Sequence, residues 1–172
     1  MNYEQLAERL LPGEYPDLAS FETRYPPRDL PKGAQVTRLA PSPTGFIHLG
    51  NLFVAIANER IAHQSGGKLF LRIEDTDLKR KVDGAVEAVI AALDYFDIRF
   101  DEGAEIGGDD TYAPWYQRQR AEIYRAYVKD LIRRGRAYPC FCTEEELAAL
   151  RDEQVANKEI TGYYGEYAKC RN

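Results

Sequence analysis

The chain has 172 residues, a formal charge of −5 and 12% aromatic residues, which is the composition of an ordinary soluble globular protein. No apolar run reaches the length of a membrane span, and the N-terminus carries acidic residues where a signal peptide has a basic start, so we expect a cytoplasmic protein. The acidic balance argues against broad affinity for nucleic acids. From its length, one domain is expected.

The first part of the chain, residues 1–35, is predicted to be an N-terminal extension. Residues 3–10 have the apolar spacing of a short helix. Residues 25–33 contain three prolines and a glycine, which predict an extended connection. No chemistry is assigned to this extension.

The next residues predict a strand, a helix and a second strand. Residues 35–40 and 68–73 are strand-like, and the helical pattern between them, within residues 49–67, ends at a pair of glycines. This order is typical of the βαβ unit of a parallel sheet. The predicted apolar face of the helix is formed by Leu49, Leu52, Phe53, Ile56 and Ile61.

Further elements are expected toward the C-terminus. Helices are predicted at about residues 82–96 and 115–134. A short strand-like segment, residues 137–142, leads into another helix at residues 143–154, whose first residues form a capping box.

The loop within residues 38–51 is predicted to carry the functional site. Ligands of open parallel sheets bind beyond the carboxyl ends of the strands, where this loop lies. Two prolines hold it extended, and His48, Gly50 and Asn51 fall at the start of the following helix. Free N–H groups at a helix N-terminus favour an anion, so the pattern predicts a phosphate-binding loop.

Longer motifs indicate which phosphate chemistry this is. The sequence contains neither G-x-G-x-x-G nor G-x-x-x-x-G-K-[ST]. Instead it reads TRLAPSPTGFIHLGN, then LRIEDTD, FDEG, RQRAEIY, RGRAYPCFCTEEEL and TGYYGEYAKCRN. From residue 36 onward these motifs closely resemble the glutamyl-tRNA synthetase family, with HLGN at the HIGH signature of class I aminoacyl-tRNA synthetases. Arg118 departs from the pattern, since relatives usually have serine there.

The resemblance implies the fold and the reaction. It implies an α/β fold, the N-terminal half of a class I synthetase Rossmann-like nucleotide-binding fold with a parallel sheet and flanking helices. The implied reaction is activation of L-glutamate by ATP, with Mg²⁺, to glutamyl-adenylate, followed in the full-length protein by transfer to tRNA(Glu). The parent enzyme is expected to be a monomer.

The resemblance also implies a domain organisation. Residues 1–35 would be the N-terminal extension, residues 36–139 the first half of the catalytic domain, and residues 140–172 the truncated start of the acceptor-stem insertion. The second half, with its KMSKS loop, is expected beyond this chain. We therefore expect the fragment alone to be weakly active or inactive.

Site residues follow from the same resemblance. His48 is implied as the catalytic residue, donating to a phosphate oxygen of ATP. Arg38 would hold the carboxylate of the substrate glutamate, while the Ala40 backbone, Ser42 and Glu74 would recognise its α-amino group. The implied ATP-binding residues are Thr44, His48, Gly50 and Asn51.

Simpler interpretations exist for several of these residues. His48 could only cap the helix. Glu74 belongs to a cluster, residues 74–77, that could itself be a helix cap, with the aspartates ordering the next loop or touching Mg²⁺. The basic runs at residues 79–81 and 133–136 are interpreted as solvated faces rather than RNA-binding sites.

The three cysteines, an odd number, favour reduced thiols or a metal site over disulfides. Cys140, Cys142 and Cys170 resemble three ligands of the zinc site of some family members. Asn172 stands where those members have a histidine, and the first two cysteines are closer together than in common zinc motifs. No metal site is therefore assigned, and zinc binding is left open with Tyr164 or Tyr167 as a substitute ligand.

Two alternative functions are also left open. One is that of a shorter paralogue that glutamylates queuosine on tRNA(Asp). The other is a nucleotide-binding module that catalyses nothing.

Overall fold

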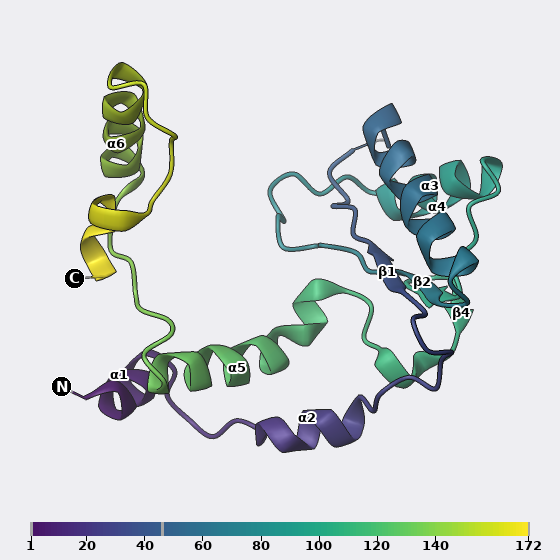
Figure 1. The fold of residues 1–172 in the computed structure, drawn as a ribbon, viewed down its shortest axis with the longest axis horizontal. Coiled ribbons are helices and arrows are strands. Elements are labelled where there is room, and N and C mark those ends of the chain that lie inside the picture. Colours follow the sequence, from purple (N-terminus) through teal and green to yellow (C-terminus); the bar gives the residue numbers. More distant parts are fainter. Residues whose placement is uncertain (1, 46, 172) are drawn as a thin grey trace. The chain divides into compact units, whose positions relative to one another are not determined.

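A computed structural model describes residues 2–45 and 47–171 of the chain. It contains two compact units, one formed by Met1–Glu14 with Tyr127–Asn172 and the other by Tyr15–Ala126 (Figure 1). This division differs from the single domain expected from length. Chain length alone does not predict this division. The sequence does not mark the boundary between the units either, because the boundary falls within one continuous helix, α5 (Ala121–Arg133).

The larger unit is built on a four-stranded sheet in the order β1-β2-β3-β4. Strands β1, β2 and β3 are parallel, and β4 is antiparallel to β3. The register pairs Val36 with Lys68 and Leu39 with Leu71. The strands are β1 (Val36–Leu39), β2 (Lys68–Leu71), β3 (Glu102–Gly103) and β4 (Gly107–Gly108).

The helix α3 (Leu49–Gln64) connects β1 to β2, so the predicted βαβ unit is confirmed. It ends at Ser65, and the glycines that follow allow the chain to turn into β2. The other helices of this unit are α2 (Leu18–Arg24), α4 (Ala85–Tyr95), and the 3₁₀ helices η1 (Asp110–Tyr112) and η2 (Gln117–Arg120).

The smaller unit contains short helices and part of α5. Helix α6 begins at the predicted capping box, in which Thr143 and Glu146 each bond the other's backbone N–H. The buried Lys129 of α5 donates to a carboxylate oxygen of Glu8 at 2.9 Å, which ties α5 to the N-terminal helix. The helices are α1 (Tyr3–Leu10), α6 (Glu144–Ala156), η3 (Gly165–Tyr167) and η4 (Lys169–Arg171).

The core of the larger unit joins the sheet to α3 and α4. The side chains that form it are apolar and nearly fully buried, as expected for a parallel sheet covered by helices. They include Leu39, Leu69 and Leu71 of the strands, Ala55 and Ala62 of α3, and Val89 and Leu93 of α4.

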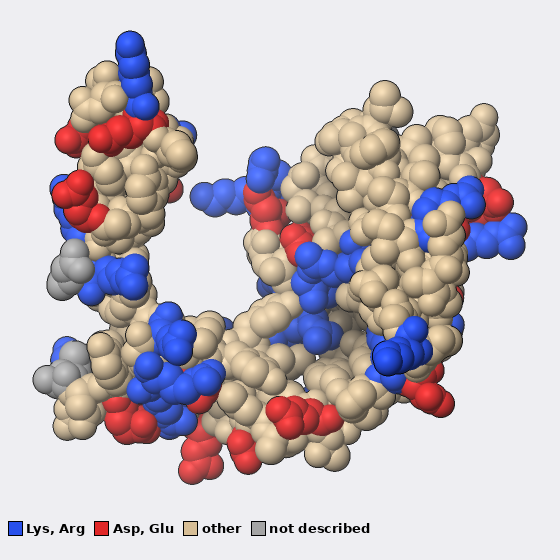
Figure 2. Space-filling model, in the orientation of Figure 1, with Lys and Arg blue, Asp and Glu red and all other residues tan. Residues whose placement is uncertain are grey.

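Most of the predicted apolar face of α3 does not face this core, and of its five residues only Leu52 packs against it. Leu49 is 81% exposed and Phe53 is 71% exposed, while Ala55 and Ala62 make the buried contact. Figure 2 shows the surface over the first turns of α3 in tan, without charged groups. Small alanines allow close approach of helix and sheet, so periodicity of large residues pointed to the wrong face.

Four other local features differ from expectation. Residues 137–142 form no strand, and Phe141 among them is 77% exposed. Residues 115–120 are not α-helical, because Tyr116 forms a bridge with Ile73 before η2 and α5 begin. Helix α2 was not expected, and neither were strands β3 and β4, which are only two residues long.

Among the described residues, no helix is both long and apolar enough to cross a membrane.

Candidate active site

The predicted site loop leaves the carboxyl end of β1 and enters α3. His48 is the N-cap of α3, in extended conformation, so it stands where the loop becomes helix. The backbone ties this loop to the end of β2, because the Glu74 N–H donates to Pro41 O at 3.0 Å. The loop is therefore fixed at the sheet edge where parallel sheets bind ligands.

His48 is held by its own neighbours. Its Nδ1 accepts from the Gly50 N–H at 3.1 Å, and its backbone N–H donates to Asn51 Oδ1 at 3.3 Å. An accepting Nδ1 carries no proton, so the proton of the neutral ring is on Nε2. His48 thus caps the helix, as in the simpler interpretation, and also presents Nε2–H as a donor.

Glycine at position 50 has a packing reason in this loop. A Cβ atom there would lie 3.0 Å from His48 Cε1 and 3.1 Å from Nδ1. The ring would have to move, and its bond to the Gly50 N–H would be disturbed. Gly50 therefore maintains the orientation of His48 as well as leaving the backbone open to a ligand.

Five of the eight predicted site residues line one open cavity of about 360 Å³. Ile47 and Val89 add apolar surface to it. Polar surface nevertheless predominates in its lining, which suits a polar or charged ligand. The five residues are Ala40, Ser42, Thr44, His48 and Asn51.

Arg38 and Glu74, the two predicted site residues of opposite charge, contact each other. Arg38 Nη1 donates to Glu74 Oε1 at 3.1 Å, and Arg72 Nη2 lies 3.7 Å from the same oxygen. The Arg38 side chain is 37% exposed and that of Glu74 is 32% exposed. Such exposed pairs contribute about 0–1 kcal/mol, so a ligand with its own charges can replace this contact at little cost.

The structure brings in Arg72, which the sequence analysis did not select. Its side chain is largely buried, and its Nε has no hydrogen-bond partner among the described residues. Arg72 lies inside the LRIEDTD motif, two positions before Glu74. In a strand, residues two positions apart lie on the same face, so this spacing could have indicated a contact between them.

The aspartates after Glu74 are engaged in holding loops. Asp77 accepts from the backbone and side chain of Arg80, at 3.1 Å and 2.5 Å. Asp75 accepts from the Arg118 backbone N–H at 2.9 Å. Since this bond uses the backbone, it does not depend on the side chain at position 118, where the sequence departs from its relatives.

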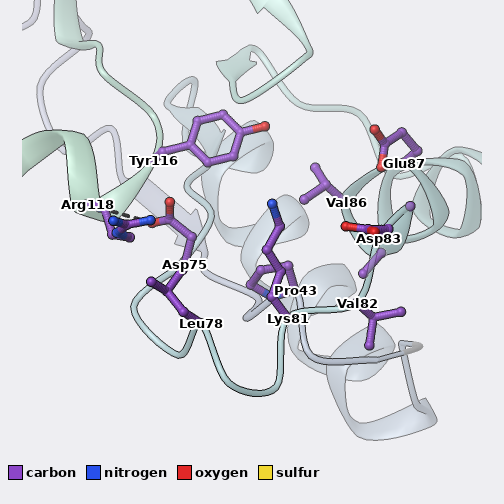
Figure 3. A pocket seen from close by; sticks show the side chains of 12 residues that line it. Pro43, Asp75, Leu78, Lys81, Val82, Asp83, Val86, Glu87, Tyr116 and Arg118 are labelled. Carbon is purple, nitrogen blue, oxygen red and sulfur yellow. Dashed lines mark hydrogen bonds between the residues drawn. The ribbon is translucent and has the colours of Figure 1, made fainter.

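A second cavity, of about 240 Å³, lies beside Pro43 and the N-terminus of α4 (Figure 3). The Lys81 side chain extends into it toward Tyr116, and Asp75 lies beside Arg118. Asp75, Asp83 and Glu87 line it together with Lys81 and Arg118, so its lining has no single sign of charge.

The three cysteines gather in the smaller unit. Their Sγ atoms lie within 4.8 Å of one another, and those of Cys142 and Cys170 are 3.6 Å apart. The Tyr163 hydroxyl lies 3.4 Å from Cys142 Sγ and accepts from the Cys170 N–H at 2.9 Å. The hydrogen bond with Tyr163 and that from the Phe141 N–H lower the pKa of Cys170 to about 7.

The two tyrosines suggested as substitute ligands are engaged elsewhere. The Tyr164 hydroxyl donates to Ile160 O at 2.5 Å, and the Tyr167 hydroxyl donates to Glu159 Oε2 at 2.5 Å. Tyr163 lies by the thiols instead, which corrects the suggestion. Asn172, at the position of the fourth ligand in zinc-binding relatives, lies outside the described residues.

The fold and the loop define the class of protein. A parallel βαβ unit whose first loop carries HLGN into a helix N-terminus is the first half of a class I synthetase Rossmann-like fold. The family model described as "tRNA synthetases class I (E and Q), catalytic domain" matches residues 35–171. The chain belongs to this family.

Curated relatives agree with the family. The chain is 55% identical over 174 residues to a glutamate–tRNA ligase of Acetivibrio thermocellus and 53% identical to one of Clostridium perfringens. Both alignments cover 100% of this chain and 32% of the relative. The chain thus spans about a third of the length of the curated relatives it matches, and the queuosine-modifying alternative is not favoured.

Solved structures give the same result. The crystal structure of glutamate–tRNA synthetase from Elizabethkingia anophelis is similar with a TM-score of 0.66 and 38% identity, covering 78% of this chain and 27% of that one. A glutamate tRNA ligase from Elizabethkingia meningosepticum, solved with its amino acid, gives 0.63 and 38%, over 77% and 26%.

Proposed function

We propose that the protein carrying this chain activates L-glutamate with ATP and transfers it to tRNA(Glu). The observation that carries the proposal is the cavity beyond β1, which brings His48, Asn51, Thr44, Ser42 and Ala40 together at the N-terminus of α3. High identity to glutamate–tRNA ligases supports it. The expected division into residues 1–35, 36–139 and 140–172 remains a proposal about the whole protein.

The substrate side of the proposal uses the ion pair beside the cavity. Glutamate carries carboxylates and an ammonium group, and Arg38 and Glu74 present the complementary charges 3.1 Å apart. A bound glutamate would exchange this exposed contact for two of its own, with a carboxylate on Arg38 and the ammonium on Glu74. Ser42 and the Ala40 backbone would complete the recognition of the amino group.

The nucleotide side of the proposal uses His48. In the reaction a carboxylate oxygen of glutamate bonds to the α-phosphorus of ATP, and the bond to pyrophosphate breaks. Transfers of this kind depend on positioning and on stabilising the charge of the phosphoryl group. The Nε2–H of His48 and the positive end of the α3 dipole would supply such stabilisation, with Thr44 and Asn51 beside the nucleotide.

Mg²⁺ is the expected companion of ATP in this class. Asp75 and Asp77 are already bonded to Arg118 and Arg80, so they are poor candidates for its ligands. We propose that Mg²⁺ is held chiefly by phosphate oxygens and water, as is usual for this ion. The proposed working form is a cytoplasmic monomer.

Pyrophosphate exchange tests this function. A full-length protein that contains this chain should incorporate labelled pyrophosphate into ATP when L-glutamate is present, and much less with L-aspartate or L-glutamine. Failure to exchange with any of the three, by a protein that still binds ATP, would favour the inert nucleotide-binding module. Transfer of glutamate to tRNA(Asp) rather than tRNA(Glu) would favour the queuosine-modifying alternative.

For the thiol cluster we propose zinc binding. Three cysteine thiols within 4.8 Å of one another and a nearby tyrosine oxygen form a donor set that zinc would accept once the thiols lose their protons to it, with Tyr163 or water as the fourth ligand. Metal analysis of the chain, equilibrated with zinc and then freed of excess, should give one zinc per chain. Cys142→Ser should abolish binding and Tyr164→Phe should not, whereas a wild-type chain without zinc would refute the site.

A further inference from the structure

The N-terminal extension includes a segment that packs into the larger unit. We define residues 17–28, which comprise α2 and the turn after it, as the strap. In α2, Phe21 is buried and packs in a small cluster with Ile123 and Ala126 of α5, with Leu18 and Tyr25 at its edge. The strap is therefore seated on α5 by apolar contacts within this unit.

Beyond α2 the strap bonds a segment far away in sequence. The Tyr25 hydroxyl donates to Ala113 O at 3.1 Å, and the Tyr112 hydroxyl donates back to Pro26 O at 2.8 Å. The Arg28 guanidinium stacks on the Tyr112 ring, 3.6 Å from its centre. Two reciprocal bonds and a stack thus fix residues 112 and 113 to the strap.

Arg28 also forms the most buried ion pair of this unit among the described residues. Both of its terminal nitrogens donate to the Glu102 carboxylate, whose side chain is 3% exposed. Glu102 belongs to β3. The strap is therefore held to the sheet itself as well as to residues 112–113.

The same distant segment bonds both neighbours of Glu74, through the backbone of Ile73 and through the side chain of Asp75. The Ile73 N–H donates to Trp115 O and the Gln117 N–H donates to Ile73 O, both at 2.9 Å. On the other side of Glu74, Asp75 accepts from the Arg118 N–H (Figure 3). Residues 115–118 thus form a clamp around Glu74.

We propose that the strap positions Glu74. Through Tyr112 and Ala113 it fixes residues 112–118, and through Ile73 and Asp75 these fix the backbone that carries the Glu74 carboxylate. Tyr25 and Arg28 are accordingly positioning residues. The consequence for glutamate rests on the proposed function, in which Glu74 receives the amino group of the substrate.

The site needs such support because its own contacts are weak. The Arg38–Glu74 pair is exposed and contributes little to holding either side chain. Recognition of a small zwitterion requires groups placed to within about 0.5 Å, which depends on the shell of residues around them. The site loop supplies one backbone bond, from the Glu74 N–H to Pro41 O. The clamp adds the bonds to Ile73 and Asp75 on either side of Glu74.

Amide hydrogen exchange of the 172-residue chain tests the positioning directly. The probe variant is Tyr25→Phe combined with Tyr112→Phe, which removes both reciprocal bonds and keeps both rings. Exchange at the Ile73, Gln117 and Arg118 amides should accelerate about tenfold, because the two lost hydrogen bonds support the local stability of the clamp. Exchange at Leu71, the last residue of β2, should change less than twofold.

The matched control is Tyr95→Phe, which removes a hydroxyl from a side chain that is 83% exposed. It should leave all four amides unchanged. Acceleration confined to the three clamp amides supports the proposal. Equal acceleration at Leu71 would show only global destabilisation of the unit. No acceleration at the clamp amides would show that the clamp is independent of the strap. Either result would overturn the proposal that the strap positions Glu74.

Kinetics of the full-length protein separate this inference from the proposed function. The double variant should raise the KM for glutamate about threefold to tenfold, with the KM for ATP within twofold of the parent. Conversely, clamp amides that loosen while the KM for glutamate stays constant would leave the strap as a support of the clamp and refute the role of Glu74 in glutamate binding.

Discussion

The site loop and the clamp around Glu74 are held in different ways. In the loop, His48 bonds residues two and three positions away, and the contacts are exposed to solvent. The clamp is supported by the strap, whose contacts join residues 74 to 88 positions apart, and the Glu102 carboxylate that the strap binds is buried. A change in the loop should therefore alter chemistry with little loss of stability, whereas a change in the strap should loosen the unit.

Arg28→Ala should give the largest effect, on stability. It leaves the buried Glu102 carboxylate without its cation, and breaking a buried pair costs about 3–5 kcal/mol. Urea denaturation of the chain measures this as a loss of unfolding free energy. Arg99→Ala, at a pair whose two side chains are 78% exposed, should cost less than about 1 kcal/mol. Equal losses in the two variants would show that the strap pair is not a buried support.

His48→Ala should have the reverse profile. Losing one preorganised donor should lower the rate of glutamate activation in the full-length protein about 10²- to 10³-fold. The lost helix cap should cost only about 1 kcal/mol of stability. Pyrophosphate exchange and thermal unfolding measure the two quantities. The other histidine, His63, provides the control, since His63→Ala should keep the rate, and a His48 variant within threefold of the parent would mark that residue as only a cap.

Arg38→Ala should act on substrate affinity. The KM for glutamate should rise about tenfold or more, because a bidentate partner of its carboxylate is lost, while ATP affinity should remain nearly constant. Arg38→Lys should restore affinity only partly. Arg60→Ala serves as the control, because that side chain is 70% exposed on α3. Parallel losses of glutamate and ATP affinity in Arg38→Ala would contradict a role confined to glutamate.

The smallest expected effect is on pH dependence. His63 lies 2.9 Å from Glu59 and 3.0 Å from Asp101, and Asp101 also contacts Lys68. Burial opposes the charged ring, but the two carboxylates outweigh it and raise the pKa of His63 above 6.5. Its stabilising contribution is complete below about pH 6.5 and is lost as pH rises through the folded pKa.

The melting temperature should therefore fall by about 2 °C between pH 6 and pH 8, since His63 is partly exposed and an effect below 1 kcal/mol is expected. Asp101 acts in another range. Burial raises its pKa, but bonds from the Leu69 N–H, His63 and Lys68 outweigh this and lower it below 3.8, so its contribution is lost only in stronger acid. His63→Gln should flatten the dependence of the melting temperature on pH above pH 6. An unchanged dependence would show that groups other than His63 cause it.

The sequence predicted features that depend on neighbouring residues. The helix cap at His48 and the βαβ order follow from local composition and spacing, and the resemblance to a family supplied the meaning of the loop. The clamp could not be predicted in this way. Nothing near Tyr25 indicates Ala113 as its partner, and no spacing rule connects Arg28 to Glu102, because these contacts arise only when the sheet is assembled.

Two errors have the same origin. Large apolar residues predicted the buried face of α3, but only Leu52 of them packs on the core, and Ala55 and Ala62 make the fully buried contact. Tyr164 and Tyr167 were candidates for the thiol cluster because of their place in the chain, while the turn before η3 brings Tyr163 to it. In both cases the choice among neighbouring residues depends on backbone geometry.

One measurement tests most directly the central claim that the cavity beyond β1 is the adenylate-forming site. The ¹⁵N-labelled chain would be titrated with a non-hydrolysable glutamyl-adenylate analogue, and the amide shifts assigned. The account predicts weak, saturable shifts at Ala40, Ser42, Gly50, Asn51 and Glu74, and none in α6. Shifts concentrated elsewhere, or none in that loop at millimolar analogue, would contradict it.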